Sequence, residues 1–391
     1  MIMNYLIALT LLLTPTYSVK FELFGLSANL LMLWVFLVWL IFVLKLSAQH
    51  QWQEFWRYTK TINRKLGALI AVFFAAGIVA LFWKGFSIEK LGQFIVLFLQ
   101  PISLFFIAGF EWQKNPASKN LLTTACYILL ATMGGFAVVQ YFTLIGLPEA
   151  YWGNSVEPKR ALGFFTHPNF YALFSTPLLA LLIPDVFQNL KSKILNLKSF
   201  AWALGALGLL LSLSRAGWLG LGIAGLIYLL FAADKTIKKI ASVIVIVMVM
   251  VILSVPNLRW RFILPFYGEK SAISRVSLWQ TGVKAIKESP ILGMGLTGFS
   301  QNWNRLNTDP NIDKHNFPHN IFLNFWVETG VIGVIGVIGI MIYKGLTHRT
   351  DVFKLGIALF LIALVTQGLI DNPFFKNDLA MMFWIVLSLG L

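Results

Sequence analysis

The stretch LLLSLSRAGWLGLGIAGL, residues 209–226, places an arginine in the middle of an apolar run. The run extends from Ser199 to Ala233, and Arg215 is its only charged residue. As one helix, the run would be about 52 Å long, against a bilayer core of about 30 Å. A charge inside that core is costly. We therefore predict two helices that turn over at residues 214–216, with Arg215 at the tip of the hairpin.

The composition of the whole chain indicates a membrane protein. Of its 391 residues, 58% are hydrophobic and 12% are charged, and the mean hydropathy is +0.76. Soluble domains carry about 25% charged residues. The net charge of +15 does not indicate nucleic-acid binding, because the basic residues lie mostly in short loops between apolar runs and form no basic patch. The single cysteine, Cys126, excludes a disulfide or a thiolate metal site within the chain.

Apolar runs of about twenty residues recur along the chain and predict an all-α polytopic membrane protein with about twelve transmembrane helices. All of residues 1–391 are expected to form a single integral membrane domain. A cleaved signal peptide is the alternative for the first run. The predicted spans are residues 2–18, 28–46, 66–82, 91–110, 121–146, 167–184, 199–214, 216–233, 240–255, 319–343, 355–370 and 379–391.

The charge of the short loops predicts the orientation of these spans. Alternate loops hold 16 Lys and Arg, against 7 in the short segments on the opposite side. Because basic loops stay in the cytoplasm, both termini are expected there, with the Arg215 hairpin tip on the external, periplasmic side. A single tilted helix over 199–233 would instead separate the basic loops 185–198 and 234–239. The basic loops are residues 45–65, 111–120, 185–198, 234–239 and 344–354.

The longest predicted loop, residues 256–318, is expected on the periplasmic face. Within it, SRVSLWQTGVKAIKESP, residues 274–290, has apolar residues at helical spacing, with Ser274 as a start signal and Pro290 as a stop signal. We predict an amphipathic helix that lies at the membrane surface. The glycine-rich stretch ILGMGLTGF, residues 291–299, is expected to form a flexible, turn-rich segment.

Three arginines are candidates for binding an anionic group on the external face. Arg215 has no acid near it in the sequence, and such an arginine in a membrane protein is typically functional, although it can also snorkel to the interface. Arg275 opens the predicted amphipathic helix, where anchoring to lipid headgroups is an equally good interpretation. Arg160 precedes the sixth span and can add a further phosphate contact.

His319 is the candidate general base, because neutral imidazole accepts a proton near pH 7. It follows Pro318 and begins the tenth span beside Asn320, on the same predicted side as the arginines. His315, one turn earlier, is a competing candidate. A histidine that only forms structural hydrogen bonds is the plainer alternative.

Four further residues are supporting candidates. His167 and Asn169, in the sequence THPN, are expected to cap the start of the sixth span. Glu328, inside the tenth span, and Asp371, which opens DNPFFKND, are acids near the external face. Either acid can form a structural ion pair, pair with an arginine or orient His319.

The sequence contains no metal or cofactor motif. HExxH, a P-loop, a dinucleotide fingerprint and an external carboxylate pair are all missing, so neither a metal nor a cofactor is expected. Any chemistry then depends on arginine electrostatics and one base. That combination suits a substrate with a good leaving group, such as a lipid diphosphate. Arginines stabilise the departing diphosphate while a histidine takes the proton of an attacking hydroxyl.

Several stretches together resemble the O-antigen ligase/polymerase superfamily of bacterial inner-membrane enzymes. The resemblance is convincing over about residues 158–335, whereas the N-terminal spans match only in hydropathy. Its strongest parts are SLSRAGWLGL (212–221), SRVSLWQTGVKAIKESPILGMGLTGF (274–299) and PHNIFLNFWVETGVIG (318–333), and weaker ones are RALGFFTHPNFYA (160–172) and DNPFF (371–375).

The resemblance implies that Arg215 and Arg275 bind the diphosphate and that His319 activates the acceptor hydroxyl. It also implies a glycosyltransferase-C-like architecture, a metal-independent reaction with inversion, and an undecaprenyl-diphosphate-linked polysaccharide as the donor. The single long loop and the compact length favour a ligase, whose acceptor is a lipid A-core oligosaccharide. An O-antigen polymerase, or a related enzyme that glycosylates protein Ser/Thr, is the alternative. A transporter or flippase is less favoured, because paired charges at mid-membrane and symmetrically broken spans are not evident.

Overall fold

The structure, a computed structural model, is almost entirely helical. It describes residues 2–23, 26–154, 158–191, 196–254, 259, 270–307, 309, 312–346 and 352–391. Contacts divide the chain into two compact units. Unit 1 comprises residues 1–125, 275–347 and 368–391, and unit 2 comprises residues 126–274 and 348–367.

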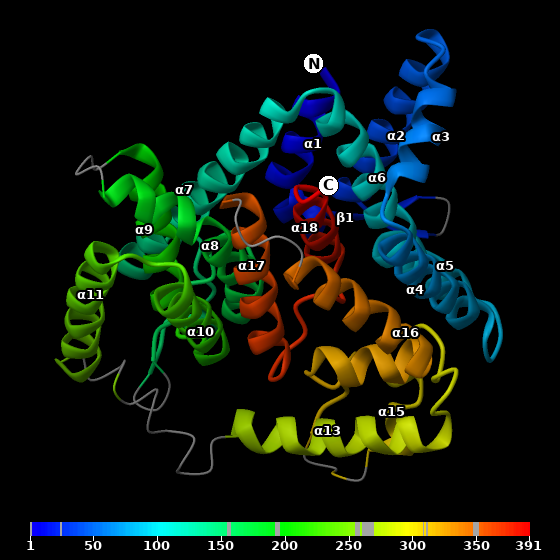
Figure 1. The fold of residues 1–391 in the computed structure, drawn as a ribbon. Coiled ribbons are helices and arrows are strands. Elements are labelled where there is room, and N and C mark those ends of the chain that lie inside the picture. Colours follow the sequence, from blue (N-terminus) through cyan, green and yellow to red (C-terminus); the bar gives the residue numbers. More distant parts are fainter. Residues whose placement is uncertain are drawn as a thin grey trace. The chain divides into compact units, whose positions relative to one another are not determined.

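Unit 1 contains most of the helices and the one strand pair of the described residues. Strands β1 (Lys20–Leu23) and β2 (Leu26–Asn29) form an antiparallel hairpin between its first two helices. Short 3-10 turns at Thr14–Ser18 and Pro116–Ser118 and a π turn at Ile95–Leu99 complete it. Its helices, all but α14 labelled in Figure 1, are α1 (Ile2–Leu12), α2 (Leu30–Ala48), α3 (Trp52–Thr61), α4 (Arg64–Phe82), α5 (Ile88–Phe94), α6 (Gln100–Lys114), α13 (Lys270–Glu288), α14 (Gly298–Gln301), α15 (Trp303–Leu306), α16 (Ile321–Leu346) and α18 (Asn377–Ser388).

Helix α18 forms the centre of unit 1. All of its residues are buried, as expected for a helix that is apolar around its whole circumference. The ring of Trp384 packs edge-on against Phe105 of α6, with 5.4 Å between ring centroids. Elsewhere in the unit, α16 packs closely on α4, and a Cβ at Gly336 would lie only 3.0 Å from the backbone of Phe73. Small residues at this spacing allow the two helix backbones to approach.

Helix α16 is kinked at Gly330, whose φ of 68° and ψ of −175° interrupt the helical geometry. The glycine-rich segment crosses the helix at this kink, since a Cβ at Gly330 would lie 1.9 Å from the carbonyl oxygen of Ile291. Residues 293–299 are buried, and the N–H of Leu296 donates to the carbonyl of Ala80 at 3.1 Å. The expectation of a flexible segment was therefore wrong: its backbone is hydrogen-bonded to α4.

The long helix of the loop, α13, starts earlier than expected. It begins at Lys270, so Ser274 lies inside the helix and does not cap it, and Arg275 lies in its second turn. The apolar residues divide between two faces. Leu278 is buried against Phe299 and Trp303, whereas Val276 and Val283, two of the apolar residues at helical spacing in residues 274–290, are exposed. An exposed apolar face is compatible with a helix that lies at the membrane surface, and this position of α13 stays a prediction.

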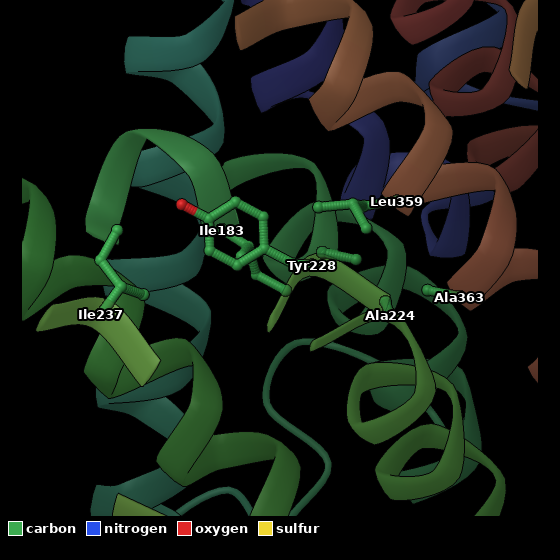
Figure 2. Packing of buried hydrophobic residues seen from close by; sticks show 7 residues of the cluster. Ile183, Ala224, Tyr228, Ile237, Leu359 and Ala363 are labelled. Carbon is green, nitrogen blue, oxygen red and sulfur yellow. The ribbon is translucent and has the colours of Figure 1, made fainter. Parts of the chain in front are cut away.

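Unit 2 is built around α8. Helices α9 and α10 both pack against it, and a small apolar core joins α8 to α10, α11 and α17 through side chains that include Ile183, Tyr228 and Leu359 (Figure 2). The helices of the unit are α7 (Lys119–Thr143), α8 (Pro168–Lys191), α9 (Leu197–Leu211), α10 (Arg215–Phe231), α11 (Lys235–Ser254) and α17 (Val352–Gly368), with a 3-10 turn at Glu149–Tyr151.

The apolar run around Arg215 is divided as predicted. Helix α9 ends at Leu211 and α10 begins at Arg215, and the connection includes Leu213 with a positive φ of 53°. The indole N–H of Trp218 donates back to the carbonyl of Leu209 at 3.1 Å. The interruption is confirmed, and the crossing of the membrane by each half stays a prediction.

Among the described residues, six helices are long and apolar enough to cross a membrane. Each of the twelve predicted spans overlaps a helix, so the segmentation of the chain agrees with the sequence analysis. Several of the predicted spans outside these six helices correspond to shorter apolar helices, and the count of twelve spans remains a prediction. The six are Leu30–Ala48, Arg64–Phe82, Ile88–Lys114, Pro116–Thr143, Pro168–Gln188 and Ile321–Leu346, and the shorter ones are Ile2–Leu12, Leu197–Leu211, Arg215–Phe231, Val352–Gly368 and Asn377–Ser388.

Candidate active site

His319 lies immediately before α16 and is not part of the helix. The next residue, Asn320, caps the helix, because its Oδ1 accepts the backbone N–H groups of Phe322 and Leu323, each at 3.0 Å. His319 itself has a positive φ of 48°. A non-glycine residue in this conformation is uncommon and is held there by its surroundings. The cap at Asn320 therefore fixes the backbone position from which the imidazole of His319 extends.

Asp371 holds the imidazole of His319. The Nδ1 atom of His319 lies 2.8 Å from Oδ1 of Asp371, whose side chain is 5% exposed against 22% for the histidine. Burial raises the pKa of the Asp371 carboxyl, but the hydrogen bond from His319, the charges of His319 and Arg275 and the N–H of Asn372 outweigh it, so the pKa lies below its ordinary value. Asp371 is thus a carboxylate at neutral pH. Nδ1 donates to it, and Nε2 is the nitrogen left for chemistry.

Helix α13 supports the same region from one face. Arg275 donates from Nε to the carbonyl of Ile370 at 3.0 Å, and Trp279, one turn later, donates from Nε1 to the carbonyl of His319 at 3.2 Å. Residues four apart share a helix face. Asn320 also reaches this region, since its Nδ2 donates to the carbonyl of Leu369 at 3.0 Å. Residues 369–371 are therefore each held by a different candidate residue.

His315 lies near His319 but has a different partner. The two imidazole centroids are 5.5 Å apart, and Nδ1 of His315 lies 2.7 Å from the carbonyl oxygen of Asp313. Because a carbonyl only accepts, Nδ1 of His315 is the donor. Among the described contacts, the carboxylate pairing therefore belongs to His319.

Glu328 is buried at a separate point of α16. It lies nine residues after His319 in the sequence, which is about two and a half helical turns. Its carboxylate accepts the backbone N–H of Thr297 in the glycine-rich segment. Glu328 therefore fastens that segment to α16. Of the two acids considered from the sequence, Asp371 is the one in contact with His319.

The remaining candidates form a second cluster, in unit 2. Arg160 donates from Nε to the carbonyl of Ser212 at 2.9 Å and from Nη2 to Oδ1 of Asn169 at 2.7 Å. His167 caps α8, because its Nδ1 accepts the N–H of Asn169 at 3.0 Å. The capping role expected of His167 is confirmed. Asn169 lies inside the helix and binds Arg160 instead.

Arg215 is the first residue of α10, directly after the turn that Arg160 contacts. The start of a helix carries a partial positive charge from its unpaired N–H groups. An arginine at that point strengthens the attraction for an anion such as a phosphate. The structure thus groups Arg275, His319, Asn320 and Asp371 in unit 1, and Arg160, Asn169 and Arg215 in unit 2.

A second, mostly buried charge lies in the same connection as Asp371. Lys376 contacts the hydroxyl of Tyr17 and lies over its ring, with Nζ 4.1 Å from the centroid. Its Nζ is 3.9 Å from Oδ2 of Asp378. Burial lowers the pKa of Lys376 to about 8, against the opposing effect of Asp378 and Asp371. Within the described part of the chain, no group of three metal-ligating side chains occurs.

Sequence reasoning missed Trp279 and Ser212 as partners of the candidate residues. Trp279 is one turn after Arg275, a spacing that was visible in the sequence, but the target of its N–H is 40 residues away. Ser212 acts through its carbonyl oxygen, which any residue type supplies. Contacts of this kind have no sequence signature.

Comparison with known proteins finds one family that matches part of the chain. Residues 200–338, which contain Arg215, Arg275 and His319, match the family described as O-antigen ligase. Members of this family are glycosyltransferase-like enzymes, both ligases and polymerases. No curated protein matches the chain. The similarity to the O-antigen ligase family therefore lies in residues 200–338, about a third of the 391 residues of the chain.

Proposed function

We propose that the chain is a glycosyltransferase that moves a glycan from a lipid diphosphate to an acceptor hydroxyl, as an O-antigen ligase does. The observation that supports this proposal most is the grouping of His319, Asp371 and Arg275 around residues 369–371. It combines an oriented base with a fixed cation. Together with the family match, it favours transfer chemistry over transport.

In the proposed reaction, His319 is the general base. Its Nδ1–H donates to the Asp371 carboxylate, so Nε2 accepts the proton of the acceptor hydroxyl. The hydroxyl oxygen forms a bond to the anomeric carbon of the donor. The bond from that carbon to the diphosphate oxygen breaks, and its electron pair leaves with the lipid diphosphate. Attack opposite to the leaving group inverts the anomeric configuration.

The arginines stabilise the leaving group in this proposal. The diphosphate gains negative charge as its bond to the sugar breaks, and fixed cations lower the energy of that state. Arg275 and Arg215 are assigned this role, with Arg160 as a further contact. Arg215 has the additional advantage of its position at the start of α10.

The proposed donor is an undecaprenyl-diphosphate-linked polysaccharide, and the proposed acceptor is a lipid A-core oligosaccharide. We place the protein in the bacterial inner membrane, as one integral domain with both termini in the cytoplasm. The loop 256–318 and the active site then face the periplasm. The charge distribution of the short loops supports this orientation.

Complementation of cells that lack the gene tests the proposal. His319→Ala and Arg215→Ala are expected to insert normally but to leave lipid A-core without polymer on a lipopolysaccharide gel. His50→Ala, which changes an exposed histidine outside both clusters, is the matched control and retains capping. Normal capping in both active-site variants would refute the residue assignment. Lipid A-core with a single repeat unit in the deletion strain would identify a polymerase instead.

A further inference from the structure

Aromatic side chains lie beside the imidazole of His319. The ring of Phe317 lies 5.1 Å from it and that of His315 lies 5.5 Å from it, at interplanar angles of 61° and 71°. The indole N–H of Trp279 is bonded to the backbone of the same residue. Two rings from the chain before α16 therefore lie beside the candidate base, and the indole of Trp279 in α13 is bonded to the backbone of the same residue.

These rings are only partly buried. Phe317, His315 and Trp279 all retain exposed surface, whereas Trp303, whose ring centroid lies 5.9 Å from that of His315, is 4% exposed. Aromatic side chains that serve only as core are normally covered. Partial exposure beside a catalytic candidate indicates a surface that is available to a ligand.

The segment that carries these rings is held rigidly. Pro318 packs against α13 so closely that a Cβ at Gly282 would lie 3.2 Å from it. His315 is fixed by its bond to the carbonyl of Asp313. A ligand that binds here does not have to order the rings first, and this lowers the entropic cost of binding.

The chemistry of the rings matches a saccharide. A pyranose has a face of C–H groups, whose hydrogens carry partial positive charge, and the face of an aromatic ring is negative. Its hydroxyl groups remain at the rim, where Nε2 of His319 is a polar partner, because Nδ1 of that ring is bonded to Asp371. An acyl chain would gain only apolar contact from the same rings and would have no use for this polar group.

We propose that Phe317, together with Trp279 and His315, forms a platform that stacks the terminal sugar ring of the acceptor beside Nε2 of His319. This inference rests on the proposed function, because it assigns the acceptor to the site of the base. It makes Phe317 a binding residue for the acceptor and predicts no role for it in holding the donor diphosphate.

The test is a reconstituted transfer assay in lipid nanodiscs, with purified lipid-linked polysaccharide as donor and rough lipopolysaccharide as acceptor. Phe317→Ala is expected to raise the acceptor KM by about tenfold and to leave the donor KM unchanged. Phe317→Tyr keeps the ring and is expected to restore the acceptor KM. Phe86→Ala, which removes an aromatic ring that is 55% exposed elsewhere in unit 1, is the matched control.

A binding measurement separates this inference from the proposed function. Delipidated core oligosaccharide is expected to bind His319→Ala measurably, as followed by ligand-observed NMR, and to bind the His319→Ala/Phe317→Ala double variant about tenfold more weakly than that single variant. Equal affinities of these two variants would overturn the platform. A fully active His319→Ala enzyme would overturn the proposed function instead. If Phe317→Ala changes only the recovery of protein in nanodiscs, the ring anchors the protein to lipid and the platform is refuted.

Discussion

Arg160 donates from Nε to the carbonyl oxygen of Ser212 at 2.9 Å, three residues before Arg215 in the chain. Its Nη2 donates to Asn169 in the first turn of α8 at 2.7 Å. Because the guanidinium is planar, these two bonds fix the turn between α9 and α10 relative to α8. Arg160 therefore sets the place from which α10, and Arg215 with it, begins.

Arg160→Gln is expected to impair the reaction by releasing this turn. We expect the donor KM to rise by about tenfold or more, in line with about 1.5–3 kcal/mol for a charge-assisted hydrogen bond. Asn169→Ala removes one of the two partners and is expected to reproduce part of that rise. Steady-state kinetics with varied donor measures both. A large effect of Arg160→Gln beside no effect of Asn169→Ala would show that Arg160 acts through its proposed contact with the diphosphate and not through its hold on the turn.

Asp371→Asn is expected to reduce kcat by about 10²–10⁴ without a comparable change in either KM. The amide can place an N–H against Nδ1 of His319, and the donor on that ring then moves to Nε2, where a base needs its lone pair. Asp313→Asn is the control, because only the backbone carbonyl of Asp313 contacts the imidazole of His315. Equal kcat values for Asp371→Asn and the wild type would rule out an orienting role for Asp371.

Lys376 predicts a rise in stability at alkaline pH. Its pKa is lowered to about 8 in the folded protein, from 10.5, so between these values the unfolded chain binds more protons. The free energy of unfolding then increases with pH in this interval. We expect the Tm of the wild type, relative to that of Lys376→Met, to increase between pH 8 and 10. Lys287→Met, at an exposed position of α13, should follow the wild type instead.

Gly330→Ala is expected to destabilise unit 1 strongly. The backbone there has φ 68° and ψ −175°, a conformation that is open to glycine but costs other residues about 1–3 kcal/mol. The new Cβ would also meet the carbonyl of Ile291 at 1.9 Å. Gly67→Ala in α4, where nothing lies within 4 Å, is the matched control. We expect it to stabilise by up to about 1 kcal/mol, so the Tm values of the two variants should move in opposite directions.

The segmentation of the chain was predictable because it depends on local physics. Hydropathy and the length of a bilayer-spanning helix divide the run around Arg215, and the structure breaks it at residues 212–214. The capping role of His167 follows in the same way from its place before a helix. Features that depend on residues close together in the sequence can be predicted from the sequence itself.

Errors arose where a residue's partner is distant in the chain. Helix α13 has apolar residues on two faces, so its periodicity did not show that Leu278 packs inward while Val276 stays exposed. The choice between Glu328 and Asp371 as the partner of His319 was open for the same reason, since both lie in apolar surroundings. The glycine-rich segment appeared flexible because the backbone groups that bind it belong to α4 and α16.

The three consecutive residues 369–371 have a consequence for how the protein can vary. Each of these residues is hydrogen-bonded to a different candidate: Asn320, Arg275 or His319. The length of this short connection therefore sets the distance between the base, His319, and the cation, Arg275. Insertion or deletion of one residue there would shift all three attachments at once. Substitutions of side chains at 369 and 370 leave the two backbone carbonyls in place. The length of the connection, more than the identity of those two residues, is therefore what constrains change at this position.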